Sequence, residues 1–203
     1  MMRRQIMFAT VAGMLALGVS ASPVHVRAAA AGPQFRAEEE RDIFSIFNDR
    51  NHRRGARVVA KLLAQHEVPA ISSPAIGRFE ASIEEDQVEY ELTFFNLQGV
   101  VTQSHIHIAQ TDVNGGIMAW LCKTATNPGP ATFTGPTCPA APGGTVTGTI
   151  TPADILAVGA QGIAAGEFNE FVAALRKGIA YANVHSSTFG GGEIRGQIRI
   201  DRW

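Results

Sequence analysis

The chain has 203 residues, of which 45% are hydrophobic and 17% charged, and its formal net charge is −1. This length fits one folded domain with flanking segments. The nearly balanced charge excludes the basic surface by which proteins bind nucleic acids, and it leaves no polybasic patch for a membrane surface.

The N-terminal residues have the pattern of an export signal. Arg3 and Arg4 precede an apolar segment from Ile6 to Val19, and Val19-Ser20-Ala21 offers small residues for cleavage. The apolar segment is shorter than the roughly 20 residues that span a bilayer. We therefore predict a signal peptide over residues 1–21, a secreted or periplasmic protein, and no membrane span after cleavage. An uncleaved anchor is the alternative, and the arginine pair fits both the general and the twin-arginine export route.

Residues 22–56 are predicted to form a linker. A short helix is possible in its second half, where Ile43 and Phe47 lie on one side of a helical turn. His52 in this segment, like His25 and His66, is expected to be a solvated side chain.

From Val58 onward, short apolar runs alternate with turns. The clearest run places Val88, Tyr90, Leu92 and Phe94 on one face and Glu89, Glu91 and Thr93 on the other, which is typical of an antiparallel sheet with one wet face. The other expected strands cover residues 58–64, 77–83, 105–108, 117–121, 145–150, 178–185 and 193–200, the last with Ile194, Ile198 and Ile200 on one face. About eight short strands predict an all-β fold over residues 57–203, an antiparallel Greek-key β-sandwich or flattened barrel.

One or two short helices are expected beside the strands. Thr151 as N-cap and Pro152 at the first helical position favour one helix start. Residues 167–177 place Phe168, Phe171, Val172 and Leu175 at helical spacing, with Gly178 just past the end. This apolar stripe is predicted to pack on one end of the sheet structure.

The chain has two cysteines, Cys122 and Cys138. An even count in an exported chain favours a disulfide, and closing a loop of about 15 residues stabilises a fold by roughly 3 kcal/mol. Metal ligation by the two thiols is the alternative, but neither a CxxC spacing nor a nearby histidine supports it.

Several motifs together resemble the CHRD domain, the repeated module of chordin that also occurs singly in exported bacterial proteins. They are Glu67-Val68-Pro69, Ser104-His105-Ile106-His107-Ile108, Asn114-Gly115-Gly116, Tyr181-Ala182-Asn183-Val184-His185 and the run from Gly192 through Glu193, Arg195 and Gly196 to Ile198. The resemblance extends from about Val58 to Ile200. It implies an immunoglobulin-like or superoxide-dismutase-like β module outside the cell, and a secreted or surface protein as its partner.

The histidines of these motifs indicate a possible metal site. Residues two apart in a strand point to the same face, so His105 and His107 project together. Strand pairing within the module could bring His185 alongside, but the strand order rests on the resemblance, and the sequence leaves open whether the three histidines converge. Three imidazoles with an open position suit copper or zinc, with Glu193 as a fourth ligand or outer-shell partner. The alternative is a structural network in which the histidines hydrogen-bond to loop backbone or contact Glu193. Arg195 is expected to pair with a carboxylate across strands.

Other chemistries find little support. Ser186 and Ser187 follow His185, but no nucleophile elbow surrounds them, which argues against an ordinary hydrolase. Two hypotheses follow. The first is a non-enzymatic module that recognises a secreted or surface protein. The second is a copper- or zinc-binding metalloprotein that uses His105, His107 and His185 and is a candidate for redox activity.

Overall fold

A computed structural model describes residues 55–201. The predicted signal peptide, almost all of the predicted linker with its helix, and His25 and His52 lie outside these residues. His66 is exposed, as predicted. Within the described range, no helix is both long and apolar enough to cross a membrane.

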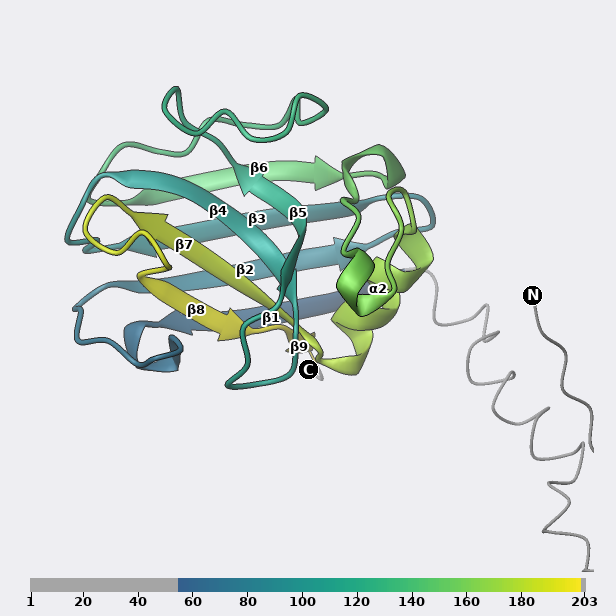
Figure 1. The fold of residues 1–203 in the computed structure, drawn as a ribbon, viewed down its shortest axis with the longest axis horizontal. Coiled ribbons are helices and arrows are strands. Elements are labelled where there is room, and N and C mark those ends of the chain that lie inside the picture. Colours follow the sequence, from purple (N-terminus) through teal and green to yellow (C-terminus); the bar gives the residue numbers. More distant parts are fainter. Residues whose placement is uncertain (1–54, 202–203) are drawn as a thin grey trace, which may run out of the picture. The chain divides into compact units, whose positions relative to one another are not determined.

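The described residues are dominated by strands (Figure 1). The strands are β1 (Ala56–Leu63), β2 (Ile76–Ile83), β3 (Val88–Phe95), β4 (Val101–Ile108), β5 (Gly116–Cys122), β6 (Gly144–Ile150), β7 (Ala180–Ser186), β8 (Ile194–Gln197) and β9 (Arg199–Ile200). The helices are α2 (Phe168–Lys177) and the short 3₁₀ helices η2 (Ala64–His66), η3 (Pro152–Asp154) and η4 (Gly159–Gln161).

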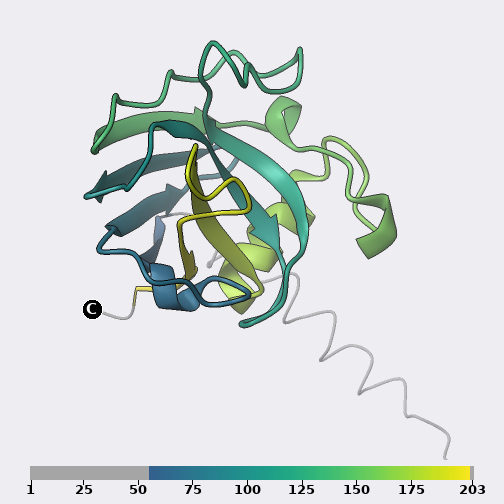
Figure 2. The ribbon, with the colours of Figure 1, turned by 60° about the vertical axis from the view of Figure 1, so that its left-hand side comes forward.

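The strands form one antiparallel sheet in the order β5-β4-β7-β8-β1-β2-β3-β6, and β9 pairs with β1. The sheet curls until it is nearly closed, so the predicted all-β fold is confirmed in its barrel form (Figure 2). In this order, consecutive strands are separated at three places, namely between β3 and β4, between β5 and β6, and between β6 and β7. The order places β4 beside β7, which is the pairing that builds the site described below.

The predicted alternation of β3 is confirmed. Val88, Tyr90, Leu92 and Phe94 are buried, whereas Glu89 and Glu91 are exposed. The same inner face receives the fully buried side chains of the neighbouring strands, among them Phe79, Ile106, Met118 and Leu121. These side chains fill the barrel, and their burial supplies the main stabilisation of the fold.

Helix α2 covers one end of the barrel, as predicted (Figure 1). It buries Phe168, Phe171 and Leu175 and ends at Gly178, whose φ of 69° is the left-handed conformation that suits glycine. The helix start predicted at Thr151 exists, but it gives only the single turn η3. Its capping box joins Thr151 and Asp154, after which the buried Ile155 enters the core and Leu156 donates to the Met118 carbonyl.

The predicted last strand is divided in two. Ile198 lies between β8 and β9 and donates its N–H to the carbonyl of Ala180, while β9 pairs with β1. The pairing with β7 ends at Ile198, whereas the pairing with β1 continues in one register from Arg195 to Ile200. Ile200 lies opposite the buried Val58, so it shares the face of Ile194 and Ile198 as predicted, but it is 40% exposed, whereas those two side chains are fully buried.

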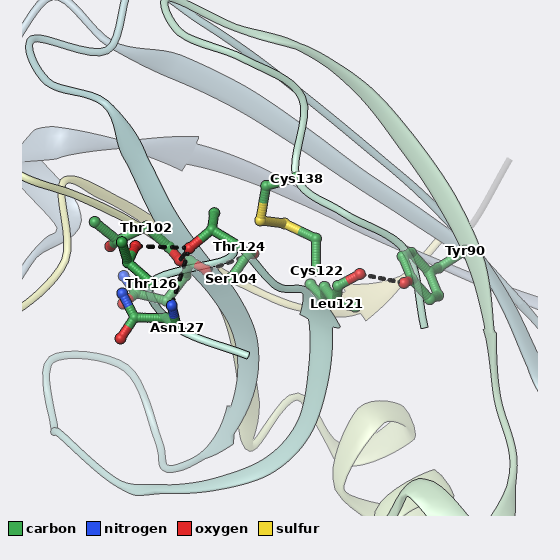
Figure 3. The surroundings of a disulfide bond; sticks show 10 residues. Tyr90, Thr102, Ser104, Leu121, Cys122, Thr124, Thr126, Asn127 and Cys138 are labelled. Carbon is green, nitrogen blue, oxygen red and sulfur yellow. Dashed lines mark hydrogen bonds between the residues drawn. A yellow bond between two sulfur atoms is a disulfide. The ribbon is translucent and has the colours of Figure 1, made fainter. Parts of the chain in front are cut away.

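A disulfide joins Cys122 and Cys138, as predicted (Figure 3). Cys122 ends β5 and Cys138 precedes β6, which are the two edge strands of the sheet. The hydroxyl of Tyr90 donates to the carbonyl of Leu121 beside the disulfide. The disulfide therefore connects the end of β5 with the segment before β6, and the hydrogen bond connects β5 with β3, the strand next to the other edge.

Candidate metal centre

The three candidate histidines lie on neighbouring strands, with His105 and His107 on β4 and His185 on β7. In the register of these strands, Gln103 lies opposite His185, and His105 lies opposite Asn183. All three side chains therefore point away from the barrel interior, because Ser104, Ile106 and Val184 occupy the alternate positions. The ligand nitrogens of the three histidines lie within 4.8 Å of one another.

These histidines are buried although they lie on the outer face of the sheet. His105 is completely buried, and His107 and His185 are only 8% and 6% exposed. Loops fold over this part of the sheet and hydrogen-bond to it. The carbonyl of Gly115, in the β4–β5 loop, accepts from His107, and that of Gly190, in the β7–β8 loop, accepts from His185.

Those two hydrogen bonds assign the tautomers of two histidines. The Nδ1 atoms of His107 and His185 each lie 3.0 Å from a backbone carbonyl oxygen. A carbonyl only accepts, so each Nδ1 carries the hydrogen and each Nε2 carries a lone pair. Both Nε2 atoms are buried without a hydrogen-bond partner in the part of the chain that the structure describes, as are both ring nitrogens of His105.

The surroundings keep the three imidazoles neutral. Burial lowers the pKa of His105 to about 2, with smaller contributions from the neighbouring His185 and His107. Burial also lowers the pKa of His107 to about 4 and that of His185 in the same direction, against the effect of their hydrogen bonds to backbone carbonyls. Neutral imidazole is the form that binds metal ions.

Aromatic rings pack against two of the histidines. The indole ring of Trp120 meets the ring of His105 edge-on, with centroids 4.3 Å apart. The ring of Tyr181 is parallel to that of His107 at 4.8 Å, and the Arg195 guanidinium lies 3.8 Å from the centre of the Tyr181 ring. The cluster is thus enclosed by aromatic rings as well as by loops.

A second polar network lies beside the histidines on the same face. Asn183 donates to the Glu67 carboxylate at 2.6 Å, and Arg195 donates to the side chain of Asn114 and to the backbone carbonyl of Val113. Burial raises the pKa of Glu67 to about 7, although the hydrogen bond from Asn183 and the charge of Arg195 act in the opposite direction. The sequence offered Glu67 only as part of a motif, and its role as a buried carboxyl was missed.

The motif residues near the C-terminus differ in what they do. Glu193 is not among the residues whose ligand atoms converge, because one carboxylate oxygen accepts from Ser73 and from the backbone of Gln98. Arg195 was expected to pair with a carboxylate. In the structure it donates instead to the side-chain amide oxygen of Asn114 and to the backbone carbonyl of Val113. Gly192 turns the β7–β8 loop with a φ of 130°, and Gly196 packs against the backbone of Lys61.

A family model of the CHRD domain matches residues 58–198, which includes every residue of the histidine cluster and of the network beside it. No curated protein and no solved structure matches the chain.

Proposed function

The chain belongs to the CHRD domain family, and we propose that this domain binds one copper or zinc ion through His105, His107 and His185. The observation that carries the proposal is the convergence of three buried imidazoles, with ligand nitrogens within 4.8 Å of one another. Three residues, each offering one nitrogen, match the ligand number of a site that keeps one position open for solvent or another ligand.

The unpartnered nitrogens support a ligand in this place. A buried polar atom without a hydrogen bond destabilises a fold by about 1–3 kcal/mol. The cluster holds four such nitrogens, two of them on His105. A metal ion would satisfy three of them together, which accounts for a cluster that is otherwise costly to bury.

The hydrogen bonds at Nδ1 support the same conclusion. Histidines that bind metals usually donate their other ring N–H to a carbonyl or carboxylate, which fixes the ring and raises the basicity of the ligand nitrogen. His107 and His185 have this arrangement through Gly115 and Gly190. The structural network expected as an alternative is therefore compatible with metal binding, because it uses Nδ1 and leaves Nε2 for the ion.

The donor set favours particular metals. Imidazole nitrogen suits copper and zinc, whereas calcium and magnesium require oxygen ligands. When bound, either ion would supply a Lewis-acidic centre, and copper would also supply a one-electron redox couple. The residues of the chain would hold the ion and keep their ligand nitrogens unprotonated.

The test is metal analysis of the protein purified from its native compartment. We expect close to one copper or zinc ion per chain in the wild type and none in His105→Ala/His107→Ala, whose folding is checked by circular dichroism. His66→Ala is the matched control, because His66 is exposed and outside the cluster. A wild type that contains no metal and takes up neither copper nor zinc when they are added would overturn the proposal.

Recognition of another exported protein is a second proposed function. It is supported by the family and by Ile76 and Phe95, which are cross-strand partners on the outer face and are 48% and 50% exposed. A disulfide-bonded domain also suits a compartment outside the cytoplasm, where such a partner would be found. Cross-linking on intact cells should capture the same protein with the wild type and with the histidine variant, but not with Ile76→Ser/Phe95→Ser. Equal capture by all three would refute this role for the surface.

A further inference from the structure

His105 differs from the other two histidines of the cluster. His107 and His185 are each fixed by a hydrogen bond from Nδ1 to a loop carbonyl. Neither ring nitrogen of His105 has a hydrogen-bond partner in the described structure. The orientation of the His105 ring therefore depends on packing alone.

The side chain that supplies this packing from β5 is Trp120. Trp120 is the cross-strand partner of His105, and its ring meets the imidazole at 74° with centroids 4.3 Å apart. On the other sides, the nearest rings are those of His185 and His107, at 4.9 and 5.5 Å. Among these three rings, that of Trp120 is the one that does not belong to a candidate ligand.

Trp120 is supported in turn by the loop that the disulfide closes. We name residues 123–137 the disulfide loop. A Cβ atom on Gly129 would lie 3.1 Å from Cε3 of Trp120, so the backbone of the loop passes directly along the indole ring. Phe133 packs against the same ring at 6.0 Å. The indole is therefore held between the disulfide loop and His105.

The disulfide loop has little freedom to move away from Trp120. Its two ends are joined by the Cys122–Cys138 disulfide and by the hydrogen bond from the Cys138 N–H to the Lys123 carbonyl. The Lys123 ammonium donates to the Phe133 carbonyl, and the Thr124 hydroxyl donates to the carbonyl of Thr102 in β4 (Figure 3). A continuous series of contacts thus runs from the disulfide to a candidate metal ligand.

We propose that Trp120 is a positioning residue for the metal ligand His105, and that the disulfide loop maintains metal affinity by holding Trp120 in place. This inference rests on the proposed metal-binding function. A metal ligand that is free to rotate has to be ordered when the ion binds, which lowers affinity, whereas a ligand held in its binding orientation does not. Trp120 does for His105 what the Gly115 and Gly190 carbonyls do for the other two histidines.

The experiment compares copper binding by four variants with that of the wild type. The dissociation constant is measured by competition with a chelator, and the copper(II) electron paramagnetic resonance spectrum reports the ligand geometry. Trp120→Ala should bind copper at least about tenfold more weakly, the effect typical of losing an outer-shell partner, with an altered spectrum. Trp120→Phe, which restores a ring beside His105, should regain most of the affinity and the wild-type spectrum.

Two variants in the disulfide loop separate positioning from general stability. Phe133→Ala leaves Trp120 in place but removes its outer support, so its affinity should fall between those of the wild type and Trp120→Ala. Thr132→Ala, at an exposed position of the same loop, should match the wild type. If Trp120→Ala does not fold, Phe133→Ala and Trp120→Phe decide the question.

Folded Trp120→Ala or Phe133→Ala protein with the affinity and spectrum of the wild type would overturn the inference, even though metal binding itself stands. A wild type that binds no copper or zinc would instead overturn the proposed function. The two failures are therefore distinguishable.

Discussion

Replacement of Glu67 by glutamine tests whether the network beside the histidines contains a carboxyl whose ionisation opposes folding. Glu67 is 8% exposed, and burial raises its pKa from the ordinary value of 4.5 to about 7. Between these two pH values, the folded protein holds a proton that the unfolded chain has released. The contribution of Glu67 to stability is therefore complete below pH 4.5 and is lost as the pH rises through 7.

The size of the effect follows from the two pKa values. The difference between 4.5 and about 7, at about 1.4 kcal/mol per pH unit, corresponds to about 3 kcal/mol. Glutamine stays neutral at every pH, and its amide oxygen accepts the hydrogen bond from Asn183 as the carboxylate does. The free energy of unfolding of the wild type, relative to Glu67→Gln, should therefore decrease by about 3 kcal/mol between pH 4 and pH 8.

The assay is urea unfolding of the metal-free proteins at pH values from 4 to 8. The buried histidines contribute the same pH dependence to both proteins, so the difference between them isolates Glu67. Glu91→Gln is the matched control, because Glu91 is exposed on β3 and should give no such trend. A difference between wild type and Glu67→Gln that is the same at pH 4 and pH 8 would refute the assignment of a raised pKa to Glu67.

Two further substitutions test the fold that carries the site. Cys122→Ser/Cys138→Ser opens a loop with a sequence separation of 16. In a denaturant titration, this variant should have a free energy of unfolding lower by about 3 kcal/mol. An unchanged midpoint would mean that the edges of the sheet are held by other contacts. Gly196→Ala should destabilise by about 3 kcal/mol or more, because a Cβ atom would lie 2.3 Å from the Lys61 carbonyl oxygen. Gly190→Ala, where nothing lies within 4 Å of the added atom, should cost far less, and equal losses would contradict the steric argument.

Local patterns predicted which face of a strand each residue occupies. The alternation along β3 and the same-face placement of His105 and His107 both follow from the period of two, which is a property of the backbone alone. The same period placed Ile194, Ile198 and Ile200 on one face, but it did not show that Ile200, beyond the point where the pairing with β7 ends, is 40% exposed. The face of a strand that a residue occupies can be predicted from the neighbouring sequence, whereas the strands that pair with one another cannot.

Burial of the outer face could not be predicted from the same patterns. The contacts that cover the histidine cluster and the network join residues that are distant in the chain, such as Asn183 with Glu67 and Arg195 with Asn114. In a strand pattern, a polar residue opposite the core indicates solvent exposure. Here loops that pack on the sheet turn an outer face into a second interior. Glu67 lies directly after η2 in such a loop, where no strand pattern could mark it as buried.

The arrangement of the three histidines joins the structural and the metal-binding interpretations. If the histidines served only to fix loops, the hydrogen bonds of His107 and His185 to Gly115 and Gly190 would be sufficient. His105 would then contribute nothing to fixing the loops, because it is completely buried and makes no side-chain hydrogen bond within the described residues. An apolar residue of similar size would pack against Trp120 at lower cost, since it buries no unpartnered nitrogen. The presence of histidine at position 105 is therefore the feature that loop fixation leaves unexplained and that the proposed metal ion would explain.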